Sequence, residues 1–127
     1  MRVGLDVSPL ELTQAGTARY VRALETIDEV ELVLLAHRGN SRFDTVYRDA
    51  VWYPLLLPRL AGREHLDVLH CPTFRGPLHA PSCPVVVTVH DLAVLRQPEA
   101  FNQWTRQYSR LSASRVARAA RLVIAVS

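Results

Sequence analysis

The sequence predicts an α/β domain with a Rossmann-like, doubly wound and mostly parallel sheet. Short apolar segments alternate with helical segments along the 127 residues, which is typical of strands joined by crossover helices. The segment 85–89 (VVVTV) is β-branched without polar alternation, as in a strand covered on both faces. The length allows one domain with a real core and is too short for two ordinary domains.

Each element is expected from its local pattern. A helix should start at Thr17, a suitable N-cap, because apolar side chains then recur at helical spacing. A helix within residues 55–66 should be shortened or broken by Pro58 and Gly62. A long helix is expected over residues 98–120. Strands are expected at residues 2–7, 31–36, 50–53, 67–71, 85–89 and 122–126.

The end of the chain interrupts this pattern. The last expected strand is followed at once by Ser127, which stands where the next helix of a doubly wound sheet would be N-capped. We therefore interpret residues 1–127 as a single, incomplete domain.

Composition narrows the class of protein. Apolar residues make up 49% and charged residues 21%, which is typical of a globular chain. No apolar run reaches the roughly 18–20 residues of a membrane span, and Asp6 and Glu11 interrupt any signal-peptide core. We expect a cytoplasmic protein, with Cys71 and Cys83 as unpaired structural cysteines. The net charge of +3 does not indicate a nucleic-acid partner.

Ligands of open α/β sheets bind at the carboxyl ends of the strands, so the loops there hold the candidate site. Gly16 follows the first strand at the expected start of a helix, where exposed amides and the helix dipole suit a phosphate. The dinucleotide and Walker glycine patterns are both missing. A simple turn at Gly16 explains the residue equally well.

Two histidines lie at the carboxyl ends of expected strands. His90 follows the strand 85–89, where a polar side chain needs a cleft or a partner, and its imidazole can donate to a sugar hydroxyl. Asp91 can fix the loop or the tautomer of the ring. A His–Asp pair that only caps the sheet is the alternative. His70, at the end of the segment 67–71, is a candidate substrate contact, although packing alone explains it more simply.

No histidine pair has the spacing of a metal site, so no metal is expected. The long helix combines large apolar residues with many arginines and allows peripheral contact with an anionic membrane at the inner face. An ordinary solvated helix face explains the same pattern more simply. The aromatic and basic residues of the helix are Phe101, Trp104, Tyr108, Arg106, Arg110, Arg115 and Arg118.

Four segments, in the same order and at similar spacing, resemble the family 4 retaining glycosyltransferases. They are residues 1–10 with 16–20 (MRVGLDVSPL and GTARY), 67–72 (DVLHCP), 85–91 (VVVTVHD) and 119–127 (AARLVIAVS). Each motif is weak alone, but together they span essentially the whole chain.

The resemblance implies a GT-B architecture, in which this chain forms the N-terminal, acceptor-side domain and a second domain binds the nucleotide sugar. It implies a sugar transfer with retention, without a metal or other cofactor, to a glycan, lipid-linked or small-molecule acceptor. The family's residues near the donor phosphate map onto Gly16 and Thr17, and its histidine near the transferred sugar maps onto His90, supported by Asp91.

The sequence departs from the family in two ways. Ala18 stands where a second glycine is common, and the donor-binding half is absent from residues 1–127. We therefore expect these residues alone to be inactive. A stand-alone α/β ligand-binding or regulatory module without catalysis remains the alternative.

Overall fold

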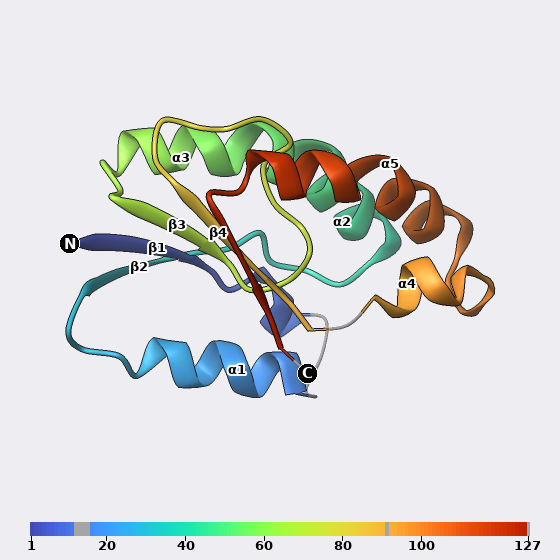
Figure 1. The fold of residues 1–127 in the computed structure, drawn as a ribbon, viewed down its shortest axis with the longest axis horizontal. Coiled ribbons are helices and arrows are strands. Elements are labelled where there is room, and N and C mark those ends of the chain that lie inside the picture. Colours follow the sequence, from blue (N-terminus) through green and yellow to red (C-terminus); the bar gives the residue numbers. More distant parts are fainter. Residues whose placement is uncertain (12–15, 91, 127) are drawn as a thin grey trace.

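The protein folds around a five-stranded, all-parallel sheet with the strand order β2-β1-β3-β4-β5 (Figure 1). The computed structural model describes residues 1–127 except 12–15, 91 and 127. The strands are β1 (Arg2–Asp6), β2 (Glu31–Leu35), β3 (Val68–Cys71), β4 (Val85–Val89) and β5 (Leu122–Ala125). The Rossmann-like α/β class predicted from the sequence is confirmed.

Helices cover the two faces of the sheet unequally (Figure 1). One face carries α1 (Gly16–Glu25); the other carries α2 (Arg42–Tyr47), the π-helix η2 (Arg48–Leu56), α3 (Leu57–Arg63) and α5 (Gln103–Ala119). Three short helical segments lie in the connections: η1 (Ser8–Glu11), α4 (Ala93–Arg96) and η3 (Pro98–Ala100).

The buried core follows this asymmetry. The larger cluster lies under η2, α3 and α5, and the smaller one joins Leu5 and Val7 to Val21 of α1. The edge strand β5 leaves Leu122 55% and Val123 43% exposed. The larger cluster consists of Leu35, Trp52, Tyr53, Leu57, Ala61, Leu66, Leu69, Cys71, Cys83, Val85, Val87 and Val116. Both thiols in it are free.

The strand predicted at residues 50–53 is wrong, because those residues lie inside η2. A four-residue apolar run is too short for its periodicity to separate a strand from a buried helix. Pro54 does not end the helix. The wider π turn, in which Leu57 N–H donates to Trp52 O, accommodates a residue that lacks an N–H. Trp52 and Tyr53 are buried, as core residues.

The ends of the other helices also differ from expectation. Thr17 is not an N-cap, because α1 already begins at Gly16. Pro58 lies in the first turn of α3 and Gly62 in its last, so the helix is short but not interrupted between them. The long helix begins at Gln103, where Asn102 caps it by accepting from Thr105 N at 2.8 Å. Its buried face consists of small residues: Ser109, Ser112 and Val116.

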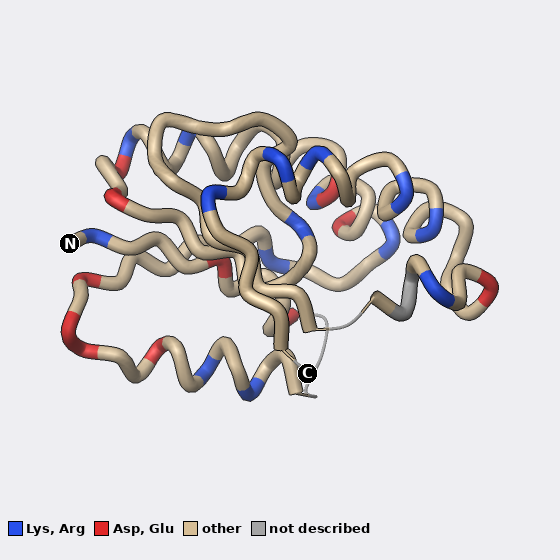
Figure 2. Tube along the Cα trace, in the orientation of Figure 1, with Lys and Arg blue, Asp and Glu red and all other residues tan. Residues whose placement is uncertain are grey.

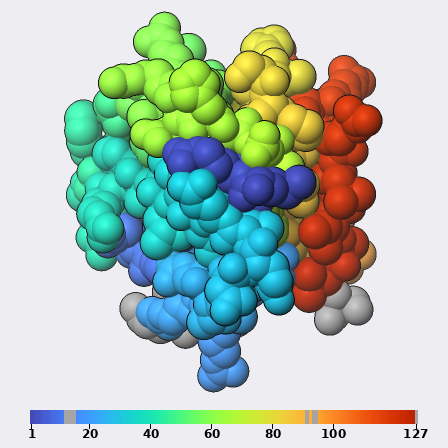
Figure 3. All heavy atoms as spheres, turned by 90° about the vertical axis from the view of Figure 1, so that its left-hand side faces the viewer, coloured from blue at the N-terminus to red at the C-terminus, as the bar shows by residue number. Residues whose placement is uncertain are grey.

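At the amino end of the sheet, the first residues are clasped by their neighbours. Arg2 pairs with Glu31 at 2.6 Å and with Glu64 at 3.1 Å, and its backbone N–H donates to Asp67 at 2.8 Å. Figure 3 views this end, with the dark-blue N-terminus at the surface between the cyan and green segments. These contacts tie β1 to β2 and to the connection after α3.

At the carboxyl end of β1, the fully buried Asp6 joins three parts of the chain. Its Oδ1 accepts from Ser8 Oγ at 2.7 Å and from the Trp52 indole at 3.4 Å, and its Oδ2 accepts from the Tyr53 hydroxyl at 2.8 Å. Ser8 Oγ in turn accepts from His37 N at 2.9 Å. Burial raises the pKa of Asp6. These hydrogen bonds lower it, but they offset only part of the increase.

Removal of the Tyr53 hydroxyl tests this junction. A hydrogen bond to a charged group contributes roughly 1.5–3 kcal/mol, so we expect Tyr53→Phe to lower the free energy of unfolding by about that amount. Urea unfolding measures the change. Tyr47→Phe is the matched control, since the structure gives its hydroxyl no hydrogen bond among the described residues. An equal, small effect of both variants would contradict the assignment.

The raised pKa of Asp6 also predicts a pH dependence. At pH values between the ordinary pKa of 3.8 and the raised pKa of Asp6, the folded chain binds the Asp6 proton more tightly than the unfolded chain does. The contribution of Asp6 to the free energy of unfolding therefore falls as the pH rises through that range. Asp6→Asn removes the titration, so the stability of the native chain should fall relative to the variant as pH rises. Urea unfolding at a series of pH values measures it, with exposed Asp28→Asn as control. The opposite trend would contradict the assignment.

Candidate functional site

The loops expected to hold the site meet at one edge of the sheet. β1, β3 and β4 are neighbours in the strand order, so the residues after Asp6, Cys71 and Val89 leave the sheet side by side. The start of α1 lies at the same end of the molecule (Figure 1). This arrangement agrees with the rule that open parallel sheets bind ligands there.

His90 is fixed at this edge by two contacts. Its Nε2 lies 2.9 Å from the carbonyl oxygen of Pro72, and its ring meets the Tyr20 ring edge-on at 5.0 Å. A carbonyl oxygen only accepts, so Nε2 carries the proton in this bond. Nδ1 of the neutral ring is then an acceptor, and it donates only when the ring is protonated. The neutral side chain therefore suits a sugar hydroxyl that donates to it, not one that accepts.

His70 and Tyr20 share one hydroxyl partner in the sheet. Thr88 is fully buried, and its Oγ1 lies 2.8 Å from His70 Nε2 and 3.1 Å from the Tyr20 hydroxyl. Burial lowers the pKa of His70, which favours the neutral ring. Through Tyr20 the two predicted histidines belong to one cluster, and His70 has a packing partner as the simpler explanation anticipated.

The remaining predicted residues have different positions. Gly16 is exposed at the first position of α1, and a Cβ atom added there meets no described heavy atom within 4 Å. Thr17 follows it, half-buried. Asp91 lies outside the described residues, so its expected partnership with His90 stays a prediction.

A pocket of about 310 Å³ is lined in part by the residues that follow Pro72. Thr73, Phe74 and Arg75 line one side of it, and they directly follow Pro72, whose carbonyl holds His90. Arg48, Asp49 and Tyr53 of η2 line another side, and Phe101, Thr105 and Ser109 complete it around α5. The pocket therefore lies between the sheet edge and the helical layer.

The acidic residue of the pocket is held by two partners. Asp49 accepts from Arg75 Nε at 3.2 Å and from the Trp104 indole at 2.9 Å. Arg75 also donates to Ser109 Oγ at 3.0 Å and lies 4.9 Å from the centre of the Tyr108 ring. Burial, ahead of the nearby Asp49 charge, raises the pKa of Tyr108 to about 12. The hydroxyl thus stays neutral near neutral pH.

Sequence reasoning missed Tyr20, Thr88, Arg48, Asp49 and Arg75. One signal was available: Thr88 is the lone hydroxyl in an apolar strand, where burial requires a partner. The contacts of Arg48, Asp49 and Arg75 depend on how η2 and α5 pack over the sheet. No local pattern in the sequence encodes that packing.

Basic residues line α5, which has no acidic residue (Figure 2). Arg110, Arg115 and Arg118 are exposed, and so is Leu111, at 72%. Within the described ranges, no helix is long and apolar enough to cross a membrane. The same part of the chain brings together no group of three or more metal-binding side chains.

Comparison with known proteins agrees with the motifs and the fold. Comparisons with curated proteins and with solved structures gave no match. Residues 10–127, nearly the whole chain, match the profile of Glycosyltransferase Family 4, whose domain is half of a GT-B fold. The α/β architecture, the cluster at the carboxyl edge and this match lead to one conclusion: the chain belongs to Glycosyltransferase Family 4.

Proposed function

We propose that residues 1–127 form the acceptor side of a retaining glycosyltransferase, which moves a sugar from a nucleotide sugar to an acceptor hydroxyl. Family membership over residues 10–127 is the observation that supports this function most strongly. The donor is held mainly by a second domain outside these residues, and the transfer needs no metal ion or other cofactor.

In this proposal Gly16 admits the donor phosphate to the start of α1. No described atom requires a glycine here, since an added Cβ atom meets nothing within 4 Å. A ligand that approaches the backbone N–H groups at the start of α1 explains why a residue without a side chain stands at position 16. Thr17, the next residue, contributes its backbone N–H to the same turn.

His90 holds a hydroxyl of the transferred sugar. Its Nε2–H is engaged by Pro72 O, so Nδ1 accepts from that hydroxyl and orients the ring. The new bond from the acceptor oxygen to the anomeric carbon forms as the bond to the phosphate oxygen breaks, on the same face. The departing phosphate accepts the acceptor's proton. Asp91 supports the loop after β4, and His70 positions Tyr20 through Thr88.

The acceptor class remains a glycan, a lipid-linked sugar or a small molecule. A cytoplasmic location, with peripheral contact between the basic face of α5 and the inner face of an anionic membrane, completes the proposal. The exposed arginines of α5 support it.

Glycine-to-alanine variants at two open positions test the role of Gly16. An added Cβ at Gly62 also has room, with Ser82 Oγ nearest at 3.7 Å, so neither variant should lose stability. We expect Gly16→Ala to lower kcat/KM for the donor by about tenfold or more, equal to roughly 1.4 kcal/mol. The matched control, Gly62→Ala, should leave kcat/KM unchanged. Equal activity of both variants would remove Gly16 from the donor site.

Substitution of His90 tests the acceptor role of Nδ1. His90→Ala should lower kcat/KM by about 3–10-fold, the value of a hydrogen bond of roughly 0.5–1.5 kcal/mol. His90→Asn keeps an acceptor near the position of Nδ1 and should recover part of the loss. The exposed His79→Ala is the control. Full activity of His90→Ala would contradict this role.

The function itself is tested by turnover. The native gene product that contains residues 1–127 should transfer sugar from at least one nucleotide sugar, with retained anomeric configuration by NMR. The purified 127-residue chain should transfer none. Inversion of the anomeric carbon would overturn the proposed mechanism. Absence of transfer across a panel of nucleotide sugars would favour a binding module without catalysis.

A further inference from the structure

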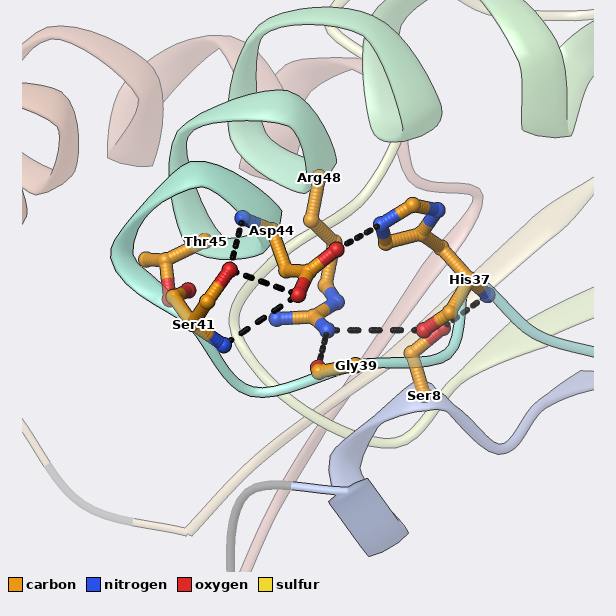
Figure 4. Close-up of polar contacts among 7 residues, drawn as sticks. All are labelled: Ser8, His37, Gly39, Ser41, Asp44, Thr45 and Arg48. Carbon is orange, nitrogen blue, oxygen red and sulfur yellow. Dashed lines mark hydrogen bonds and ion pairs between the residues drawn. The ribbon is translucent and has the colours of Figure 1, made fainter.

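Arg48 is a buried cation with no anionic partner among the described residues. It is 2% exposed and lines the 310 Å³ pocket. Its Nη2 donates to the carbonyl oxygens of Gly39 and His37 (Figure 4). Its Nε makes no hydrogen bond, and no described carboxylate forms an ion pair with the guanidinium. Since burial of an uncompensated charge is costly, the position calls for an anion.

The nearby carboxylate does not supply it. Asp49 lines the same pocket, but its two oxygens accept from Arg75 and from Trp104. Arg75 therefore neutralises Asp49. Three residues of the pocket carry a formal charge: Arg48, Asp49 and Arg75. Their net charge is one positive charge, which belongs to Arg48.

The loop that Arg48 contacts is stabilised by contacts of its own. Gly39 has φ +112°, a conformation that favours glycine, and Asp44 closes a capping box with Ser41 beside it. His37 Nε2 lies 3.3 Å from Asp44 Oδ1. Figure 4 shows that the Asp44 carboxylate is directed to Ser41 and His37. The carboxylate one helical turn before Arg48 is thus also committed.

The rest of the pocket wall is mostly apolar and includes a few residues that carry a hydroxyl. Thr73, Thr105 and Ser109, each of which carries a hydroxyl, are among its lining residues. Ser109 Oγ accepts from Arg75, which leaves its own proton for a ligand. Phe74 and Phe101 provide apolar wall, against which the C–H face of a sugar packs. A volume of about 310 Å³ is at the small end for ligand sites and fits one monosaccharide-sized molecule.

We propose that this pocket binds an acceptor that carries an anionic oxygen group, a phosphate or a carboxylate, on a single sugar-sized ring. This inference rests on the proposed function, which it deepens by naming the acceptor class. Arg48 pairs with the anionic group, and the pocket hydroxyls donate to it. The loop 72–75 connects this pocket along the chain with Pro72, whose carbonyl oxygen holds His90.

Binding without a donor tests the inference. Inorganic phosphate, glucose 6-phosphate and glucuronic acid are titrated calorimetrically into the protein, with uncharged glucose as reference. We expect glucose 6-phosphate or glucuronic acid to bind at least about tenfold tighter than glucose, a difference of roughly 1.4 kcal/mol. The stronger of the two identifies phosphate or carboxylate. Failure of all three anions to bind would overturn the inference.

Variants locate the site. Arg48→Gln keeps donors for the carbonyl oxygens of Gly39 and His37 but removes the charge. It should weaken binding of the anionic ring about tenfold or more without changing the affinity for glucose. Arg42→Gln removes an exposed arginine of the adjoining helix and is the matched control. An equal effect of both variants would indicate general surface attraction and overturn the inference.

Two further measurements keep the test decisive. If Arg48→Gln does not fold, Thr73→Ala, in a half-exposed loop, should weaken anion binding about threefold or more. The Nε–H signal of Arg75, which lines the pocket and donates to Asp49, should shift on titration, and an unmoved signal would place the ligand elsewhere. Anion binding without sugar transfer from any donor would reject the proposed function alone. Transfer to uncharged acceptors, unaffected by Arg48→Gln, would reject this inference alone.

Discussion

The buried carboxylate of Asp6 is the interaction on which the site depends. Where β1 ends, the backbone must leave the sheet and turn towards α1, and the helical layer must be held above the same point. Asp6 does both, because one oxygen fixes Ser8 and the other receives the Tyr53 hydroxyl from η2. Ser8 then fixes the loop after β2 through His37 N. Both oxygens of this one carboxylate are therefore engaged where the three segments meet.

Two segments that contribute to the candidate site lie on either side of this junction: η2 and the loop after β3. η2 brings Arg48 and Asp49 over the sheet on the same helix that supplies Trp52 and Tyr53. On the other side, the loop after β3 contributes its Pro72 carbonyl to His90 and its next residues to the pocket. One loop therefore links the cluster assigned to the transferred sugar with the pocket assigned to the acceptor.

The sequence could predict the sheet and part of the site, and the reasons are local. Strands such as 85–89 are apolar runs bounded by turn residues. His70 and His90 were proposed as site residues because His70 lies near the end of such a run and His90 follows one. Residues 50–53 were mistaken for a strand because an apolar run of four has no readable period, and Pro54 hid the helix around it. Tyr20 falls at an apolar position of the helical pattern, yet its hydroxyl binds Thr88. The partners of Arg48 and Asp49 come from distant segments whose packing no local pattern specifies.

The most direct test of the account is a crystal structure of the protein with the acceptor that supports turnover. We expect density for the acceptor in the pocket between the loop 72–75 and η2, with its anionic group on Arg48 and a hydroxyl directed towards His90. Density in the separate surface groove beside Asn40, Arg42 and Trp104 would contradict the central claim that the carboxyl edge of the sheet receives the acceptor.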